Sequence, residues 1–225
     1  MGLKSAFEHP KDIAIPSGPW KSVRMKKTLY LIPGFGETSS DPAYVRISRV
    51  AKEAGYHVVP FDPTWDRSAA TRWVADFSRI VERDGAKNAS VIGFSFGAYI
   101  AVLAAKKYDF NRLYLCSLSP YFKDDLPHIP DAAWKALGSR RKADFSSHSF
   151  PEDIGASAVF FVGEHEIRYE LQAVEKRYRA WKGEKKYIVV PDADHDLESG
   201  EYLDSLLSEI KVLHEAAVAE KDISF

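Results

Sequence analysis

The sequence predicts a three-layer α/β sandwich, in which a mainly parallel sheet of about six strands lies between two layers of helices. Two observations lead to this prediction. Short apolar runs alternate along the chain with longer amphipathic stretches, an order typical of βαβ units with right-handed crossovers. The apolar runs are mostly continuous rather than alternating in polarity, as expected for strands that are covered on both faces.

Each element is assigned from its own pattern. We expect strands at six apolar runs, which cover residues 28–33, 57–61, 90–94, 112–118, 158–163 and 186–191. Helices are expected at the amphipathic stretches, over residues 43–54, 69–83, 98–108, 169–181 and 202–219. In the last of these stretches, apolar residues recur every three or four positions and would form one buried face, at Tyr202, Leu206, Ile210 and Leu213.

Two segments do not follow this alternation. Residues 1–27 read as an irregular lead-in, which leaves residues 28–220 as a single domain. Residues 119–156 form a long insertion after the fourth strand, rich in proline, aromatic and charged residues. Because long insertions in compact domains are usually functional, we expect a small cap of one or two short helices here.

The composition excludes several classes of protein. Hydrophobic residues make up 45% of the chain and charged residues 28%, which is ordinary for a globular enzyme. The 31 basic and 32 acidic side chains nearly cancel, so the chain has no net field that would attract nucleic acid. Cys116 is the single cysteine, and no window is apolar enough for a signal peptide or membrane span. We therefore expect a cytoplasmic protein with a small-molecule substrate and no membrane or nucleic-acid partner.

The segment "GFSFG" places Ser95 directly after the third strand, at the point where a helix begins. Reactive groups collect at the carboxyl ends of the strands in a parallel sheet. A Gly-x-Ser-x-Gly pattern at such a junction is typical of a nucleophile elbow, whose sharp turn leaves no room for a Cβ at Gly93 or Gly97. The plainer alternative is a tight glycine turn with a serine that caps the helix.

A nucleophilic serine needs a base, and the base needs an acid that orients it. In this architecture the three residues occur in the order serine, acid, histidine. His195 is the only histidine between the sixth strand and the last helix, and it is the expected base. For the acid, Glu166 is preferred because it follows the fifth strand, while Glu164 and the insertion residues Asp124 and Asp125 remain alternatives.

The remaining requirement is a pair of backbone N–H groups that stabilise an oxyanion. One is expected from Phe96, the residue after the nucleophile, and the other from the loop "PGFGETS", through Phe35. The same loop lacks the lysine and threonine of a phosphate-binding loop and the third glycine of a dinucleotide site. The histidine-containing turn "GEHE" has no second spaced histidine to form a metal site, so no metal and no cofactor are expected.

These motifs, in this order, resemble the α/β-hydrolase family over nearly all of residues 28–220. "GFSFG" is similar to the family's elbow, "LIPGFGETS" to its oxyanion loop, "FFVGEHE" to its acid turn and "DADHDL" to its histidine loop. The resemblance implies Ser95 as nucleophile, His195 as base and Glu166 as acid, with oxyanion donors at Phe35 and Phe96. The chain departs from the common pattern in having Pro33 before the loop glycine, glutamate as the acid, and no counterpart of the two leading strands.

The expected activity is hydrolysis of a carboxylic ester with a small to medium acyl or aryl group. Gly34, Trp65 and Tyr99 are the expected substrate-binding residues, because they lie near the strand ends. A thioesterase or amidase with the same triad is the alternative, and the basic run Arg140 to Lys142 would favour a thioester with an anionic leaving group. A different class is a non-catalytic member of the fold that binds a ligand without turnover.

Overall fold

A computed structural model describes residues 27–66 and 68–222 of the chain; at positions 136, 139 and 213–222 it describes the backbone alone. The described residues contain one six-stranded sheet, in which every pair of neighbouring strands is parallel. The strand order is β2-β1-β3-β4-β5-β6. The bounds are β1 Lys27–Ile32, β2 Tyr56–Pro60, β3 Ser90–Phe94, β4 Arg112–Cys116, β5 Ser157–Gly163 and β6 Lys185–Val190.

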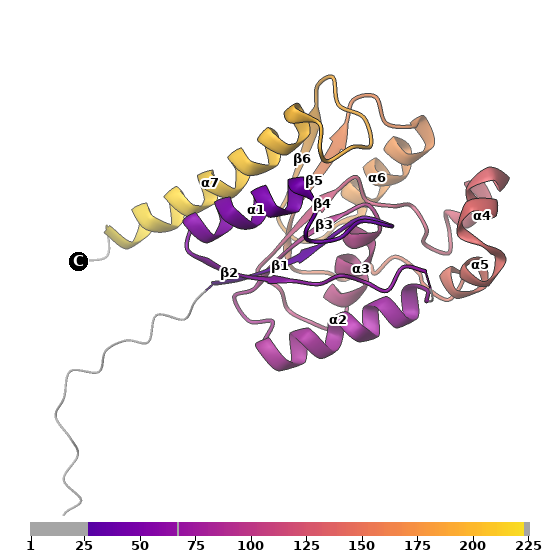
Figure 1. Cartoon of the computed structure of the whole chain (residues 1–225), viewed down its shortest axis with the longest axis horizontal. Helices are drawn as coiled ribbons and strands as arrows, with labels where there is room; N and C mark the ends of the chain where they lie inside the picture. Colours follow the sequence, from indigo (N-terminus) through magenta and orange to yellow (C-terminus); the bar gives the residue numbers. More distant parts are fainter. Residues whose placement is uncertain (1–26, 67, 223–225) are drawn as a thin grey trace, which may run out of the picture.

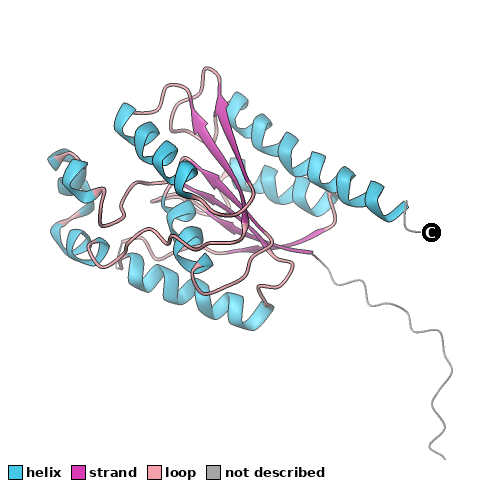
Figure 2. Cartoon of the chain, turned by 180° about the vertical axis from the view of Figure 1, so that it is seen from behind, coloured by secondary structure: helices cyan, strands magenta, loops and turns pink. Residues whose placement is uncertain are grey.

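Helices cover both faces of this sheet, as Figures 1 and 2 show from opposite sides. One layer contains α1 (Pro42–Glu53) and α7 (Gly200–Asp222), and their buried side chains share one apolar cluster. The other layer contains α2 (Ala70–Asp84), α3 (Phe96–Ala105) and α6 (Arg168–Ala180), which contribute to a second, larger cluster. The predicted three-layer α/β sandwich is confirmed.

The burial of the strands explains their sequence pattern. All five residues of β3 are buried, because β3 lies between β1 and β4 and faces a helix layer on each side. Its continuous apolar run follows from that position. Pro60 is the last residue of β2, which is an edge strand. Proline has no backbone N–H to donate, and an edge strand tolerates this because it forms hydrogen bonds to a neighbouring strand on one side only.

The predicted element boundaries agree with the structure to within three residues, as is usual for assignment from pattern. The largest differences are at the carboxyl ends of α3, which ends at Ala105 rather than at residue 108, and of α7, which ends at Asp222 rather than at residue 219. At its other end, α3 begins at Phe96, directly after Ser95, rather than at residue 98. Of the predicted apolar face of α7, Tyr202, Leu206 and Ile210 are buried, whereas the side chain of Leu213 lies outside the described part. Residues 1–26 of the predicted lead-in also lie outside it, and Lys27 already belongs to β1.

The insertion at residues 119–156, called the cap segment below, contains three short helices. They are η1 (Leu126–His128), α4 (Asp131–Leu137) and α5 (Ser139–Phe145). The segment packs against the start of α2, where the backbone N–H of Thr71 donates to Asp144 at 3.1 Å. Figure 1 shows α4 and α5 outside the helix layers of the sandwich. Among the described helices, none combines the length and apolarity that crossing a bilayer would require.

Candidate active site

Ser95 occupies the sharp turn between β3 and α3. Its φ of 53° lies in the left-handed region, which is uncommon for a residue other than glycine. The turn is held by a hydrogen bond from the Ser95 N–H to the Cys116 carbonyl at 2.8 Å. A Cβ added to Gly97 would lie 2.2 Å from the Ile32 carbonyl oxygen, and one added to Gly93 would lie 2.4 Å from the carbonyl carbon of Gly97. Both glycines are therefore required by close backbone contacts, as the sequence predicted.

His195 lies on the loop after β6, and its imidazole points toward Ser95. Nε2 of His195 is 3.0 Å from the Ser95 Oγ. The ring of Phe94, at the end of β3, packs beside the imidazole with the ring centroids 5.2 Å apart. When Nδ1 carries the proton, Nε2 is an acceptor and the Ser95 hydroxyl donates to it.

Glu166 lies behind the imidazole, in the turn that leaves β5. Its Oε2 is 3.4 Å from Nδ1 of His195. Its Oε1 accepts two hydrogen bonds, from the Gly163 N–H at 2.8 Å and the Ser117 hydroxyl at 2.6 Å. The side chain is only 1% exposed, so these donors provide the hydrogen bonds that a buried carboxylate requires.

The alternative acids lie elsewhere. Glu164 is exposed and accepts a hydrogen bond from the Asp192 N–H at 3.1 Å. Asp124 is exposed in the cap segment. Asp125 is buried and forms an ion pair with Arg177 at 2.6 Å. Of the four acids considered from the sequence, Glu166 is the one that contacts His195.

Four polar residues at the site were missed by reasoning from the sequence. Ser117 bridges Glu166 and the Tyr202 hydroxyl, which is 2.8 Å from its Oγ, and Tyr202 in turn donates to the Phe161 carbonyl at 3.1 Å. Ser119 is buried, with Oγ 3.0 Å from the Ser95 Oγ. Glu170 places Oε2 3.6 Å from Nδ1 of His195. A serine in "CSLSP" and a glutamate in a helix carry no pattern that distinguishes them from surface residues.

The charges around His195 change its pKa in opposing directions. Burial is the largest single contribution and lowers the pKa, but the hydrogen bond and charge of Glu166, with the charges of Glu170 and Glu37, together raise it. The net result is a pKa above the usual value of 6.5. For Glu170 the effect of burial has the opposite sign and raises the pKa of the carboxyl group. The charge of His195 and the hydrogen bond from the Tyr169 hydroxyl partly offset this increase.

The two expected oxyanion donors lie on neighbouring segments. Phe96 is the first residue of α3, and Phe35 is in the loop after β1; their ring centroids are 5.6 Å apart. Within residues 27–66 and 68–222, neither backbone N–H has a hydrogen-bond partner. The N–H of Gly34 is occupied instead, since it donates to the Glu37 carboxylate at 2.8 Å and the Tyr44 hydroxyl at 3.0 Å. These bonds fix the loop and leave the Phe35 amide available.

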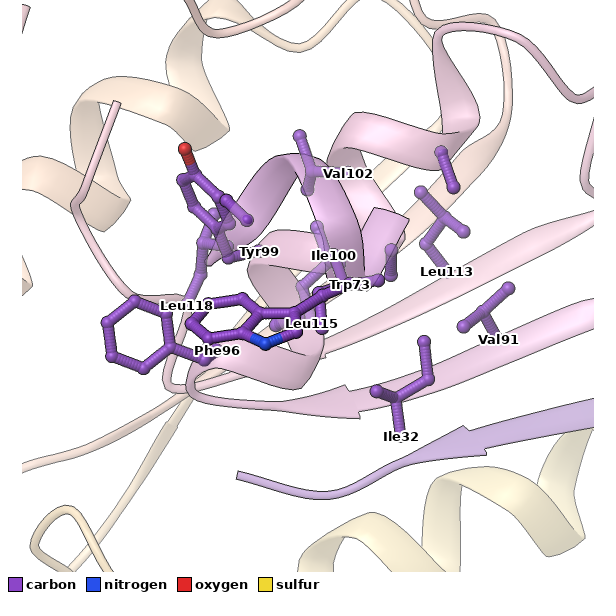
Figure 3. Close-up of a cluster of buried hydrophobic side chains, with 14 of the residues drawn as sticks. Ile32, Trp73, Val91, Phe96, Tyr99, Ile100, Val102, Leu113, Leu115 and Leu118 are labelled. Atoms are coloured by element: carbon purple, nitrogen blue, oxygen red, sulfur yellow. The ribbon is translucent and has the colours of Figure 1, made fainter. Parts of the chain in front are cut away.

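The expected substrate-binding residues are placed differently from one another. Gly34 is buried and serves the loop contacts just described. Trp65 packs against the 37%-exposed Phe35 with the two rings tilted and their centroids 5.5 Å apart, and its indole N–H donates to the Glu37 carbonyl. Tyr99 is fully buried in the core beside Phe96 (Figure 3). Its hydroxyl donates to the Tyr121 carbonyl at 3.2 Å. This placement argues against the direct substrate contact expected of Tyr99.

Among the described residues, two clusters of side chains have ligand atoms close enough together to be considered as metal sites. Ligand-type atoms of Glu164, His165 and Asp192 lie within 4.8 Å of one another, but all three residues are exposed. Exposed acidic groups often cluster without a metal, so proximity alone assigns no site here. Glu166, Glu170 and His195 are equally close, and the hydrogen bonds to Ser95, Ser117 and Gly163 already explain the arrangement of Glu166 and His195.

Comparisons with known proteins agree with this fold. A search of curated proteins found no match. Among solved structures, Est1E from Butyrivibrio proteoclasticus with ferulic acid bound is similar, with a TM-score of 0.71, 16% identity and coverage of 85% of this chain and 89% of that one. A putative hydrolase from Agrobacterium vitis S4 has a TM-score of 0.70 at 17% identity, covering 82% and 87%. A monoacylglycerol lipase from Paleococcus ferrophilus has a TM-score of 0.66 at 17% identity, covering 84% and 94%.

At these identities the structural matches establish the fold alone. The sequence itself matches the model of one family, described as the alpha/beta hydrolase family, over residues 29–217. That match covers all but the first residues of the sheet, both helix layers except the end of α7, and the Ser95, Glu166 and His195 positions. The chain belongs to the alpha/beta hydrolase family.

Proposed function

We propose that this protein is a serine hydrolase that cleaves carboxylic esters through an acyl-enzyme on Ser95. The observation that carries the proposal is the contact of 3.0 Å between the Ser95 Oγ and Nε2 of His195, whose Nδ1 faces the buried Glu166. A serine, an imidazole and a carboxylate in this sequence of contacts form the arrangement that activates a serine hydroxyl. The side chain of His195 is 35% exposed, so a substrate can reach the base.

In the first half of the reaction, His195 accepts the Ser95 proton at Nε2 while Oγ attacks the ester carbonyl carbon. The tetrahedral intermediate then collapses, His195 donates its proton to the alkoxide leaving group, and the alcohol departs. In the second half, His195 removes a proton from a water molecule as the water oxygen attacks the carbonyl carbon of the acyl-enzyme. The second tetrahedral intermediate then collapses, the bond to the Ser95 Oγ breaks, and His195 returns its proton to that oxygen as the carboxylic acid departs. Glu166 keeps Nδ1 protonated and stabilises the imidazolium in both halves.

The amides of Phe35 and Phe96 are the proposed donors to the oxyanion. Both lack a partner within the described residues, and Phe96 begins α3, whose first N–H groups favour negative charge. Donors fixed in advance toward the developing charge contribute most to catalysis of this kind. The mechanism requires no metal and no organic cofactor.

The proposed substrate is an ester with a small to medium acyl or aryl group. Phe35 is 37% exposed and lies against Trp65 and Phe96, so an apolar or aromatic group beside the Phe35 amide would meet ring surfaces. The structural neighbours are consistent with this range, since they include an esterase with ferulic acid bound and a monoacylglycerol lipase. The buried, unpaired Cys116 is compatible with the proposed cytoplasmic location.

A thioesterase is the second candidate. One structural neighbour is the RedJ thioesterase of the prodiginine pathway in Streptomyces coelicolor, with a TM-score of 0.62 at 16% identity, covering 89% of this chain and 90% of that one. The basic run of the cap segment gives little support, because the Arg141 guanidinium donates to the Ser68 and Leu137 carbonyls and Lys142 lies over the Trp134 ring. We therefore keep the ester as the proposed substrate class.

Hydrolysis assays on matched substrates test this proposal. We would measure hydrolysis by wild type and by Ser95→Ala. The substrates are nitrophenyl esters of increasing acyl length, the corresponding thioesters and the corresponding anilides. We expect the esters to give the highest kcat/KM and Ser95→Ala to lose at least about 10³-fold of it. Higher kcat/KM for thioesters would select the second candidate. Ligand binding without any turnover of the three series would indicate a non-catalytic member of the fold.

A further inference from the structure

A second carboxylate faces the imidazole of His195 and is not used in the mechanism above. Glu170 lies in the first turn of α6, and its Oε2 is 3.6 Å from Nδ1 of His195. Oε2 of Glu166 is 3.4 Å from the same nitrogen. Nδ1 has a single proton to donate, so two carboxylate oxygens compete for, or share, one N–H group.

The surroundings of Glu170 leave His195 as its positive partner. The Glu170 side chain is 15% exposed, and its Oε1 accepts a hydrogen bond from the Tyr169 hydroxyl at 3.0 Å. Within the described part of the chain, no lysine or arginine forms an ion pair with it. The start of α6 adds a partial positive charge, because the first N–H groups of a helix have no partners within it. A largely buried carboxylate is thus aimed at the imidazole with no other full charge to balance it.

We propose that Glu170 is a positioning residue that, together with Glu166, orients His195 and stabilises its imidazolium form. This inference rests on the proposed function, since the imidazolium forms when Ser95 gives up its proton. The positive charge grows toward the transition state, and both carboxylates interact more strongly with it there than with the neutral ring. Glu166 holds the ring through a buried carboxylate that is itself fixed by the Gly163 N–H and the Ser117 hydroxyl, whereas Glu170 adds a second negative charge from α6.

The other groups around His195 do not duplicate this role. Glu37, from the loop after β1, also contributes negative charge, but its carboxylate is engaged by the Gly34 N–H and the Tyr44 hydroxyl. Phe94 and Ser95, from the end of β3 and the turn that follows, bring no charge to the ring. Removal of the charge on Glu170 therefore leaves the hydrogen bonds of Glu166 and Glu37 intact and changes one carboxylate alone.

The direct test is the titration of His195 by NMR on protein labelled with ¹³C-histidine, with Glu170→Gln compared to wild type. His195→Gln identifies the resonance. Glutamine keeps the size of the side chain and removes its charge, so we expect the pKa of His195 to fall in Glu170→Gln. Glu175→Gln, on the same helix but paired with Arg179 at the surface, is the matched control and should leave it unchanged. An unchanged titration in Glu170→Gln would overturn the proposal.

Kinetics provide the second readout. With the ester that wild type cleaves best, we expect Glu170→Gln to lose about three- to tenfold in kcat/KM at neutral pH, a size typical of one partly screened charge. The acid limb of its pH profile should move to lower pH. A purely structural role would lower kcat/KM without moving that limb, and this result would also count against the proposal.

The two readouts separate this inference from the proposed function. If the His195 titration shifts as expected but wild type hydrolyses no ester, thioester or anilide, Glu170 acts on His195 and the hydrolase proposal is the one that fails. If Ser95-dependent hydrolysis is present but the titration does not shift, Glu170 has no such role. Should Glu170→Gln not fold, Glu170→Asp keeps the charge but withdraws it from the ring, and a smaller shift in the same direction is expected.

Discussion

The imidazole of His195 lies between one hydroxyl and two carboxylates, so its protonation state decides whether Ser95 can be activated. Burial favours the neutral ring, but the carboxylates together outweigh burial and raise the pKa of His195. Below that pKa the ring is protonated and cannot accept the Ser95 proton. We therefore expect the proposed activity to be lost as pH falls through the raised value.

For wild type we expect the acid limb of kcat/KM to have its midpoint above 6.5, the usual value for histidine. The profile is measured across the pH range in which histidine titrates, with the best ester as substrate. If the acid limb of the Ser95-dependent activity instead has its midpoint at or below 6.5, the result would contradict a raised pKa of His195.

The identity of the acid is a second question at this scale. Glu166→Gln removes the buried charge behind His195, and we expect kcat/KM to fall by about 10²-fold. Glu164→Gln is the matched control, because Glu164 is exposed two residues away and, among the described residues, its carboxylate accepts a hydrogen bond from the Asp192 N–H alone. Equal losses in the two variants would show that the acid has been wrongly assigned.

At the scale of elements, the site depends on how closely α3 approaches the carboxyl end of β1. A Cβ at Gly97 would lie 2.2 Å from the Ile32 carbonyl oxygen and 2.5 Å from that of Pro33. Both oxygens belong to backbone at the end of β1, which cannot move without disturbing the sheet and the loop that contains Phe35. The glycine therefore lets the turn that contains Ser95 lie close to the loop that contains Phe35, the proposed oxyanion donor.

We expect Gly97→Ala to lower the free energy of unfolding by about 3 kcal/mol, a cost typical of overpacking in a core. Urea denaturation of wild type and variant measures it. Gly155→Ala is the control, because Gly155 is exposed and a Cβ there would have nothing within 4 Å. Similar midpoints for Gly97→Ala and wild type would refute the close contact.

At the scale of the whole molecule, Arg141 connects the cap segment to the body of the fold. Its guanidinium donates to the carbonyls of Trp65, Ser68 and Leu137 and lies over the Phe35 ring, 5.0 Å from the centroid. One side chain thus links α5, the loop after β2 and the exposed aromatic ring beside the proposed oxyanion donor. The planar guanidinium can satisfy several acceptors at once, which a lysine could not do in the same geometry.

Arg141→Met should loosen this connection and cost about 1–2 kcal/mol, because acceptors in a partly buried site lose their donor. We expect faster cleavage of the cap segment by chymotrypsin under native conditions than in wild type. Arg140→Met, which changes the exposed neighbouring residue, should be cleaved at the wild-type rate. The same rate for both variants would mean that Arg141 does not hold the cap segment.

Local patterns were sufficient to predict the sheet, its helix layers and three residues that meet at its edge. Ser95, Glu166 and His195 each follow a strand, and parallel strands bring such positions together. Tyr99 could not be placed in this way, because α3 is buried on nearly all sides and its aromatic residue faces the core. Ser117, Ser119 and Glu170 were missed because tertiary contacts alone give them a role.

The most direct test of the central claim is covalent labelling of Ser95 by a fluorophosphonate, located by peptide mass spectrometry. Reaction requires a serine activated by its base, and it does not depend on knowing the natural substrate. We expect wild type to be labelled at Ser95, Ser95→Ala not to be labelled, and His195→Ala to react much more slowly. A folded wild-type protein that stays unlabelled, or one labelled equally fast in His195→Ala, would contradict an activated serine at this site.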